Sequence, residues 1–439
     1  MLKTLVGAFK NKDIRKKVLY TLMILVVVRV GSLLPIPGVD TEYFSSLLSG
    51  INTGDLSYLS AFTGGSFERM SLFALSITPY ITSSIIMQLL AIAIPKLEEM
   101  QKEGEDGRKK IAAITRYVTI ALALIESIAM AVGFGRSGLI KGYQGFSTLH
   151  YIVSIIVVVA ALTAGLAMLM WLGERITENG VGNGISIVLL INIISGMPSD
   201  FATLYSTFVA PRTIAKGVLA AAIIIAILVV MVVLVCFLQD GERRIPVQYS
   251  QKVSGRKTFG GQSTNIPLKV NTAGVMPVIF ASSLMQFPVI IAQLFGKSYE
   301  WTRYLSSSYW CRISAPKYSI GLILYIVLLI IFAYFYTSIT FNPIEVADNL
   351  KKAGGVIPGI TPGKSTSDYL NNILNYIVFV GAVGLLIIAL IPIMCTGFFN
   401  ASVSFGGTSV IIIVGVVLET LKQIESQMVN RYYKGFLSE

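Results

Sequence analysis

The sequence is poor in histidine and in charged side chains. Its 439 residues include one histidine, His150, and only 13% are Asp, Glu, Lys or Arg. Histidine is the usual general base and the commonest metal ligand, so its scarcity argues against hydrolytic and metal-dependent chemistry. Hydrophobic residues make up 54% of the chain, a larger share than soluble domains carry. The composition predicts a polytopic membrane protein with no metal and no cofactor of its own.

Cysteine is also scarce. The three cysteines, Cys236, Cys311 and Cys395, are odd in number and widely spaced, so they predict neither a disulfide framework nor a thiolate metal site. An enzyme working inside the membrane would need a serine with a histidine, a pair of aspartates or a metal-binding set within its apolar segments. The sequence offers none of these sets, and we therefore expect a protein without catalytic activity.

Two glycine-rich stretches resemble nucleotide-binding loops without matching them. In GITPGKST (359–366) the first glycine is one residue too close to the Gly-Lys-Ser, and Pro358 and Pro362 remove backbone donors that phosphates need. NGVGNGIS (179–186) lacks a preceding strand and a downstream acid. The first is predicted to be a turn, the second a tight turn that leads into a helix. Any ATP that drives the protein is then hydrolysed by a partner.

Ten apolar runs are long enough to cross a membrane, whose hydrocarbon core of about 30 Å needs about 20 helical residues. They lie at residues 18–34, 71–94, 117–134, 151–171, 185–205, 217–238, 271–295, 319–341, 373–396 and 405–423. An even number of spans places both termini on one side. The sequence predicts an all-α fold with a first half at 18–210 and a second half at 211–423.

Lysine and arginine are distributed unevenly about these spans. The two tails and the loops on their side hold 25 of these residues, the opposite loops hold nine, and Arg29 lies within the first run. Positive residues are enriched on the cytoplasmic side. The tails, 1–17 and 424–439, and the long polar loops at 240–270 and 342–370 are therefore predicted to be cytoplasmic. The basic N-terminal segment lacks a small-residue cleavage site, so it is predicted not to be a removable signal peptide.

Proline and glycine interrupt four of the ten runs. The second contains Pro79, the fifth breaks at residues 196–200, the seventh contains Pro277 and Pro288, and the tenth is short and begins with FGGTS. These are the second and fifth runs of each half, and two halves of five spans must lie in opposite orientations. Interrupted spans at corresponding positions of inverted repeats point to a transport path. The alternatives are that these residues are simply common in membrane helices, or that the path serves a small solute in a secondary transporter.

Two ionisable residues lie within predicted spans. A carboxylate at Glu126, midway along the third run, is costly unless paired or hydrated, and such residues are functional by default. We predict that Glu126 lies on the pathway; the alternative is a carboxyl satisfied inside the bundle without a role. Arg29 lies near the outer end of its run, from where its guanidinium reaches the interface, and no functional role is expected for it.

The loop at residues 240–270 is basic and has aromatic residues interleaved with its cations. A surface of this kind suits RNA or an acidic protein partner. The alternative is that these basic residues bind no partner and only set the orientation of the chain in the membrane. The loop is longer than that signal requires, so a docking role is predicted.

Eight motifs along the chain resemble one family. They are SLLPIPGVD at 32–40, TPYITSSIIMQLL at 78–90, KEGEDGRKKI at 102–111, MWLGERITENGVGNGISI at 170–187, ERRIPVQY at 242–249, QSTNIPLKVNTAGVMPVIFASS at 262–283, FNPIEVADNLKKAGGVIPGI at 341–360 and FGGTSVIIIV at 405–414. In order and spacing the chain resembles the SecY family of bacterial protein-translocation channels, from the first predicted span to the last. The resemblance implies an hourglass channel of two inverted halves, which passes unfolded secretory polypeptides across the plasma membrane and releases transmembrane segments sideways into lipid.

The resemblance also implies a pore ring and a plug. The ring residues are Ile77, Ile81, Leu189, Ile279 and Ile412. The plug occupies residues 55–66, with apolar side chains at Leu56, Tyr58, Leu59 and Phe62 and a hinge at Gly64 and Gly65. A ring of aliphatic side chains excludes water and ions and deforms around a passing chain.

A lateral gate and a docking surface are implied as well. The gate residues are Thr82, Glu126, Asn271, Ser282, Ser283 and Phe287. All of them except Phe287 form a polar seam held by contacts of about 1 to 2 kcal/mol each. The docking residues are Arg243, Arg244, Arg256, Lys257, Lys351, Lys352, Thr361 and Lys364. The family usually has an arginine where this chain has Thr361, so either Lys364 replaces that charge or the partner differs.

The partners that the resemblance implies are of three kinds. The small membrane subunits SecE and SecG would complete the channel, and the SecA ATPase or the ribosome, including its RNA, would dock on the cytoplasmic loops. Signal sequences, nascent polypeptides and membrane lipid would meet at the gate.

Overall fold

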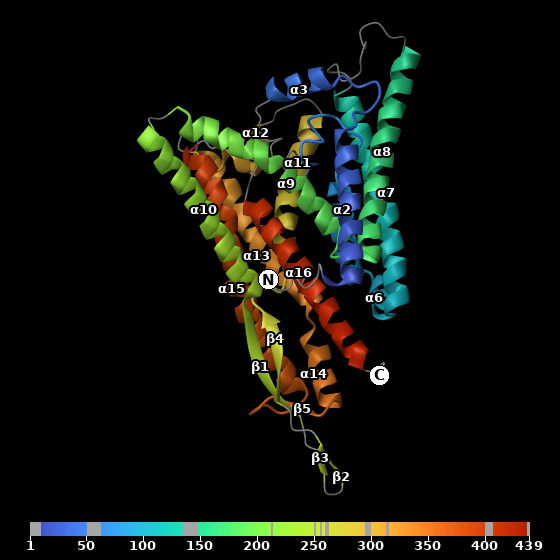
Figure 1. Ribbon diagram of the computed structural model, residues 1–439, viewed down its shortest axis with the longest axis vertical. Helices are drawn as coiled ribbons and strands as arrows, with labels where there is room; N and C mark the ends of the chain where they lie inside the picture. Colours follow the sequence, from blue (N-terminus) through green and yellow to red (C-terminus); the bar gives the residue numbers. More distant parts are fainter. Residues whose placement is uncertain are drawn as a thin grey trace.

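The apolar runs form helices because a backbone that leaves water must satisfy its own hydrogen bonds. The structure, a computed structural model, describes residues 10–50, 63–134, 148–211, 214–249, 252–254, 257–259, 263–294, 300–312, 316–399 and 407–436. In Figure 1 the helices stand as a bundle, and a β-ribbon projects beyond one end, which we call the ribbon end. The short helices α3 (Thr41–Gly50) and α12 (Glu300–Leu305) lie at the opposite end.

Each predicted span overlaps a helix. These helices are α2 (Lys12–Leu33), α5 (Thr78–Ala93), α7 (Glu105–Phe134), α8 (Thr148–Asn179), α9 (Gly184–Leu204), α10 (Ile214–Asp240), α11 (Met276–Leu294), α13 (Ile320–Thr340), α15 (Lys364–Phe399) and α16 (Gly407–Phe436). Within the described residues, six helices are long and apolar enough to cross a membrane, or seven if α5 and the short α6 (Pro95–Lys102), bent by 106°, form one span. The count of ten spans stays a prediction.

The two interruptions predicted in the first half differ from the structure. Helix α5 begins at Thr78, not at residue 71, and Pro79 lies in its first turn, where a missing N–H costs nothing. The proline therefore starts this helix instead of breaking it. The expected break at residues 196–200 is absent, because α9 continues through Pro198 to Leu204. Neighbouring groups in a membrane bundle satisfy the backbone that such a proline frees.

The segment before α5 is a series of turns. Met70 has φ 43° and Ser76 has φ 52°, left-handed values that side chains other than glycine rarely adopt. Ser76 directly precedes Ile77, so this unusual backbone aims the first ring residue.

Asparagine side chains begin two of the helices. Asn183 accepts hydrogen bonds from the N–H groups of Ile185 and Ser186 at the start of α9, and Gly182 before it has φ 81°. The tight turn predicted for residues 179–186 is thus present, and Asn183 caps the helix that follows it. Asn342 caps α14 (Pro343–Lys352) in the same way, accepting from Ile344 N.

Among the described residues, two pairs of long helices bring the two halves of the chain into contact. Helix α9 of the first half packs against α16 of the second, and α7 packs against α11. Within the first half α7 lies against α5 and α8, and within the second half α11 lies against α13. The contact between α7 and α11 places the third and seventh predicted spans together, where the lateral gate is expected.

A three-stranded sheet at the ribbon end joins the two long polar loops. Strand β1 (Glu242–Tyr249) pairs with β4 (Ser263–Lys269), and its last residues pair with β5 (Gly355–Val356), all antiparallel. Ile245 and Val247 alternate with exposed residues along β1 and pack with Leu268 and Leu350 in one apolar cluster. Strands β2 (Lys252–Ser254) and β3 (Lys257–Phe259) extend the ribbon. The sequence predicted loops here, not a sheet.

Candidate functional site

The five predicted ring residues lie in, or pack against, one apolar cluster that takes side chains from both halves. Ile77, Leu189, Ile279 and Ile412 are 1%, 5%, 7% and 1% exposed members of this cluster, and Ile81 is partly buried against it. They come from the first turn of α5 and the residue before it, from α9, α11 and α16. Two of these elements belong to each half, so the cluster joins the halves through aliphatic side chains. Such a contact lacks directional bonds and deforms without breaking hydrogen bonds.

Aromatic and polar side chains support the cluster. The Phe280 ring lies edge-on to the rings of Phe332 and Tyr336 on α13, with centroids 5.8 and 6.0 Å apart. On the other side, Asn192 Nδ2 donates to Ser76 Oγ at 3.3 Å, and its Oδ1 is buried without a partner among the described residues. The hydrogen bond ties α9 to the turn that carries Ile77.

Of the two predicted hinge glycines, Gly64 lies directly against α9. Gly64 and Gly65 have φ values of 62° and 79°. A side chain on Gly64 would meet Ser195 Oγ at 2.5 Å and the Asn192 carbonyl at 2.7 Å, whereas one on Gly65 would meet nothing within 4 Å. Gly64 is therefore fixed by conformation and by close approach. The predicted plug residues Leu56, Tyr58, Leu59 and Phe62 lie outside the described residues.

A short polar chain connects this glycine to the first helix. Arg29 Nη1 donates to Ser195 Oγ at 2.8 Å, and Ser195 Oγ lies 2.7 Å from the Asn192 carbonyl and 3.4 Å from that of Gly64. Arg29 thus points toward α9. The sequence predicted that its guanidinium would reach the membrane interface, and did not predict this contact with Ser195. The position of a charged residue inside an apolar run was the signal that could have predicted a partner within the bundle.

The predicted gate residues line neighbouring helices but are not joined by hydrogen bonds to one another. Thr82 Oγ1 donates to the Thr78 carbonyl of its own helix at 3.1 Å, and Ser282 hydrogen-bonds to Tyr325. Within the described residues no hydrogen bond or ion pair joins any two of Thr82, Glu126, Asn271, Ser282 and Ser283. Phe287 lies on α11, but its side chain is not among those described.

Asn271 lies just before α11 and is 6% exposed. Its Nδ2 is buried without a partner among the described residues, and its backbone passes close to Gly381 of α15. An unmet amide donor in an apolar interior is costly.

The sheet gathers most of the predicted docking residues at the ribbon end. Arg243 and Arg244 are exposed on β1, Lys351 and Lys352 on the last turn of α14, and Lys364 at the start of α15. Thr361 Oγ1 donates to Ser365 Oγ at 3.0 Å. Arg256 lies outside the described residues, and Lys257 lies on β3 with a side chain that is not described.

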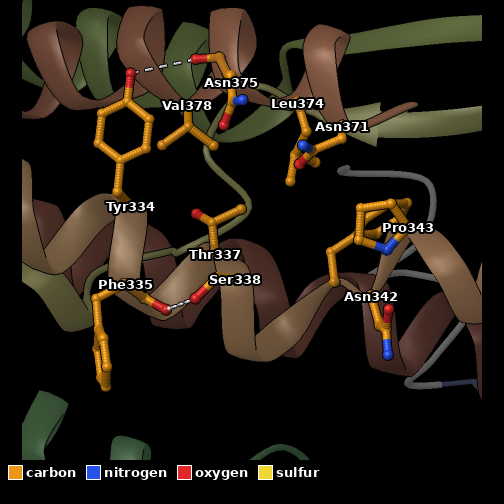
Figure 2. Close-up of a pocket in the computed structure, with 11 residues that line it drawn as sticks. Tyr334, Phe335, Thr337, Ser338, Asn342, Pro343, Asn371, Leu374, Asn375 and Val378 are labelled. Carbon is orange, nitrogen blue, oxygen red and sulfur yellow. Dashed lines mark hydrogen bonds between the residues drawn. The ribbon is translucent and has the colours of Figure 1, made fainter. Parts of the chain in front are cut away.

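A groove of about 390 Å³ lies between α13, α14 and α15 at the ribbon end. In Figure 2 the side chains of Tyr334 and Thr337 point from α13 toward α15, and the Tyr334 hydroxyl donates to the Asn375 carbonyl at 3.4 Å. Asn371 and Leu374 complete the wall on the α15 side. The lining holds no carboxylate and no cation, so it suits a neutral, partly apolar chain or side chain.

Comparisons with a family model, with known sequences and with solved structures agree on one family. The SecY family model matches residues 71–421. The protein translocase subunit SecY of Streptomyces galbus is 44% identical over 446 residues, which covers 100% of both chains. A solved SecY protein, whose plug domain stabilises the closed translocation channel and maintains a membrane seal, is similar with a TM-score of 0.60 at 18% identity, over 94% of this chain and 92% of that one. Sec61 in the canine ribosome-channel complex gives a TM-score of 0.57 at 17% identity, over 94% and 93% of the two chains.

The two solved structures share the fold, and the family follows from the sequence matches. A transporter of a small solute, the alternative that the interrupted spans left open, has no support from either kind of comparison. The chain is a multi-pass protein of the bacterial plasma membrane. It belongs to the SecY family, as a subunit of a protein-conducting channel and not as an enzyme.

Proposed function

We propose that unfolded secretory polypeptides cross the membrane at Ile77, Ile81, Leu189, Ile279 and Ile412, the ring residues of this apolar cluster. The observation that carries this proposal is the convergence of these side chains from four elements of both halves into one buried cluster. In the resting state the aliphatic side chains fill the centre and exclude ions. A passing chain replaces their mutual contacts with its own, so the seal closes around it.

The residues 55–66 act as a plug, and Gly64 and Gly65 are its hinge. The left-handed backbone of both glycines and the close approach of Gly64 to α9 support a fixed anchor on the ring side of the hinge. The solved SecY relative whose plug domain maintains a membrane seal supports the same role.

Transmembrane segments and signal sequences leave sideways between α5 and α7 on one side and α11 and α13 on the other. Opening there separates α7 from α11, one of the helix pairs through which the halves touch. Because no hydrogen bond joins the described gate residues across this seam, separation costs mainly apolar contact, which an apolar signal sequence replaces.

The ribbon end faces the cytoplasm and receives the partner that drives transport. Arg243, Lys351 and Lys364 lie exposed on elements that the sheet and its apolar core hold together. Sec61, a protein of the same fold, is found in a ribosome-channel complex, which supports the ribosome as one partner. The SecA ATPase, ribosomal RNA and the small subunits SecE and SecG are further partners that the family resemblance favours.

A photo-crosslinking amino acid at Ile81 tests the pathway directly. Ile81 is the partly buried ring member, so a bulkier side chain is tolerated there. A secretory chain stalled midway should form an adduct at this position. The matched control is Val229, 56% exposed on α10, where no adduct to the stalled chain is expected. Adducts of equal yield at both positions, or none at Ile81, would contradict the proposed path.

A further inference from the structure

The segment between α11 and α13 carries an unexpected positive charge. It lies at the end opposite the ribbon, where the predicted loops hold nine lysines and arginines in all. Four of them, Lys297, Arg303, Arg312 and Lys317, fall within residues 296–319, together with a single acidic residue, Glu300. Loops on the side opposite the cytoplasm are normally poor in positive charge, so the excess of lysine and arginine in this segment calls for an explanation in its own structure.

A rigid scaffold carries these cations. Trp310 is 2% exposed, and its Nε1 donates to the Tyr304 carbonyl at 2.8 Å. A side chain on Gly321 would collide with that same carbonyl, and one on Gly397 would meet the Trp310 carbonyl at 2.7 Å. We call α12 with η4 (Ser307–Tyr309), Trp310, Arg312 and η5 (Pro316–Ser319) the aromatic cap. Its packing against α13 and α15 fixes it before any ligand arrives.

Two tyrosine rings of the cap hold the three described cations. The guanidiniums of Arg303 and Arg312 lie 5.8 and 5.0 Å from the centre of the Tyr309 ring. Lys317 Nζ lies 4.9 Å from the centre of the Tyr318 ring, which in turn packs edge-on against Tyr309 at 5.9 Å. Hydrogen bonding to the Tyr318 phenol raises the pKa of Arg303 above its ordinary value.

Among the described residues, the cations of the cap form no close ion pair, and the Glu300 carboxylate acts on Arg303 and Lys317 only from a longer distance. No salt bridge within 4.0 Å joins Arg303, Arg312 or Lys317 to a described acidic residue. Arg312 Nε is shielded from solvent and donates to no described acceptor. The face of a tyrosine ring attracts a cation, but two guanidiniums over one ring repel each other. An anion placed among them removes that repulsion.

From this arrangement we propose that the aromatic cap binds the phosphate group of an anionic phospholipid. Arginine forks suit the oxygens of a phosphate, and several such donors bind it more strongly than a single point charge. The site is distinct from the polypeptide path and from the docking surface at the ribbon end.

Membrane lipid is the source of phosphate that the position of the cap favours. Trp301 on α12 is 45% exposed, and Ile320 and Ile323 in the first turn of α13 are each 63% exposed. Tryptophan and tyrosine gather at the level of the lipid headgroups, where apolar helix surface begins. The cations of the cap therefore lie where the phosphates of one leaflet lie.

Trp301 provides a local reporter for the test. The chain has three tryptophans; in a Trp171→Phe background those that remain, Trp301 and Trp310, both belong to the cap. The full chain in detergent micelles is titrated with brominated phosphatidylglycerol, with brominated phosphatidylcholine and with brominated phosphatidylglycerol in the presence of inorganic phosphate. The lipid concentration at half-maximal tryptophan quenching, the quenching midpoint, is measured in each case. The variant is Arg303→Gln/Arg312→Gln. The control is Arg15→Gln/Lys16→Gln, which removes the same charge from exposed positions of α2.

The expected result is a midpoint lower for phosphatidylglycerol than for phosphatidylcholine, raised about tenfold by Arg303→Gln/Arg312→Gln and unchanged in the control. Lys317→Gln, which leaves the Tyr309 ring untouched, should raise it about threefold if the double variant does not fold. Equal midpoints for the two lipids, or midpoints unaffected by both cap variants, would overturn the proposal. Displacement by inorganic phosphate at concentrations equal to those of the lipid would overturn the lipid as the source.

Discussion

Arg29 of the first helix donates a hydrogen bond to Ser195 of the fifth predicted span, with Nη1 2.8 Å from Oγ. Ser195 Oγ also lies within 3.4 Å of the Gly64 carbonyl. The pair therefore connects the half-buried Arg29 guanidinium to the proposed hinge of the plug. The guanidinium is kept inside the bundle by an acceptor that also touches the hinge.

Ser195→Ala should loosen this hinge. The change leaves the Arg29 donor without its acceptor, at a cost of about 1 to 3 kcal/mol. Resting vesicles that contain the assembled channel should then leak ions, measured as conductance without substrate. Ser199→Ala on the same helix is the control, since its hydroxyl donates only to the Gly196 carbonyl and is exposed. Equal conductance in the two variants would exclude the proposed latch.

The two hinge glycines should respond differently to alanine. Both have a left-handed φ, so each alanine costs about 1 kcal/mol in backbone strain. Only at Gly64 does the new methyl also meet Ser195 Oγ and the Asn192 carbonyl. Gly64→Ala should therefore lower the unfolding temperature and raise resting conductance more than Gly65→Ala. Matching effects from both would mean that conformation alone matters at this hinge.

The ring predicts a contrast between buried and lipid-facing isoleucines. Ile279→Ala opens a cavity in the central cluster and should cost about 2 to 5 kcal/mol, with a higher resting ion conductance. Ile225 is 61% exposed on α10, and its truncation leaves no internal cavity. Ile225→Ala should change stability by less than about 0.5 kcal/mol and leave conductance unchanged. A resting conductance that Ile279→Ala does not alter would remove Ile279 from the seal.

The course of the spans could be predicted from the sequence because hydropathy over about 20 residues is a local property. Helix α10, whose central residues are nearly all aliphatic, begins and ends within three residues of its predicted bounds of 217 and 238. Pro198 was harder, because its effect depends on neighbours in space. The ring residues came from the family resemblance, since an isoleucine such as Ile412 is indistinguishable in sequence from any other apolar side chain of a span.

Contacts between distant segments could not be predicted from composition or periodicity. Strand β1 pairs with β5 more than 100 residues later, through Gln248 with Val356, and two residues of β5 carry no recognisable strand pattern. The contact of Arg29 with Ser195 spans 166 residues. Both contacts depend on how distant segments of the chain pack together, and a single sequence does not determine that packing.

Two adjacent arginines at the ribbon end should differ in their contribution to docking. Arg244 forms an ion pair with Glu242, with Nη2 2.6 Å from Oε1, whereas Arg243 has no ion pair among the described residues. Arg243→Gln should weaken ribosome binding about threefold to tenfold at low salt, with less effect at high salt. Arg244→Gln should have the smaller effect, because Glu242 already offsets its charge. Binding measured at two ionic strengths checks both; a larger loss for Arg244→Gln would contradict this ranking.

Thr361→Arg should strengthen docking at little cost to the fold. Thr361 is exposed, and its side chain makes one hydrogen bond, to Ser365 Oγ. The Thr366 hydroxyl donates to the Thr361 backbone carbonyl at 3.0 Å, a bond that survives any side chain at 361. We therefore expect a stability change below about 0.5 kcal/mol and tighter binding of an acidic or RNA partner, because an added arginine restores the charge that the family usually has at this tip. Thr361→Ala separates the two effects, since it removes the same hydroxyl without adding charge. If binding to ribosomes or to the motor ATPase is no tighter in Thr361→Arg than in Thr361→Ala, the tip does not contact the partner through this residue, and Lys364 becomes the cation to test next.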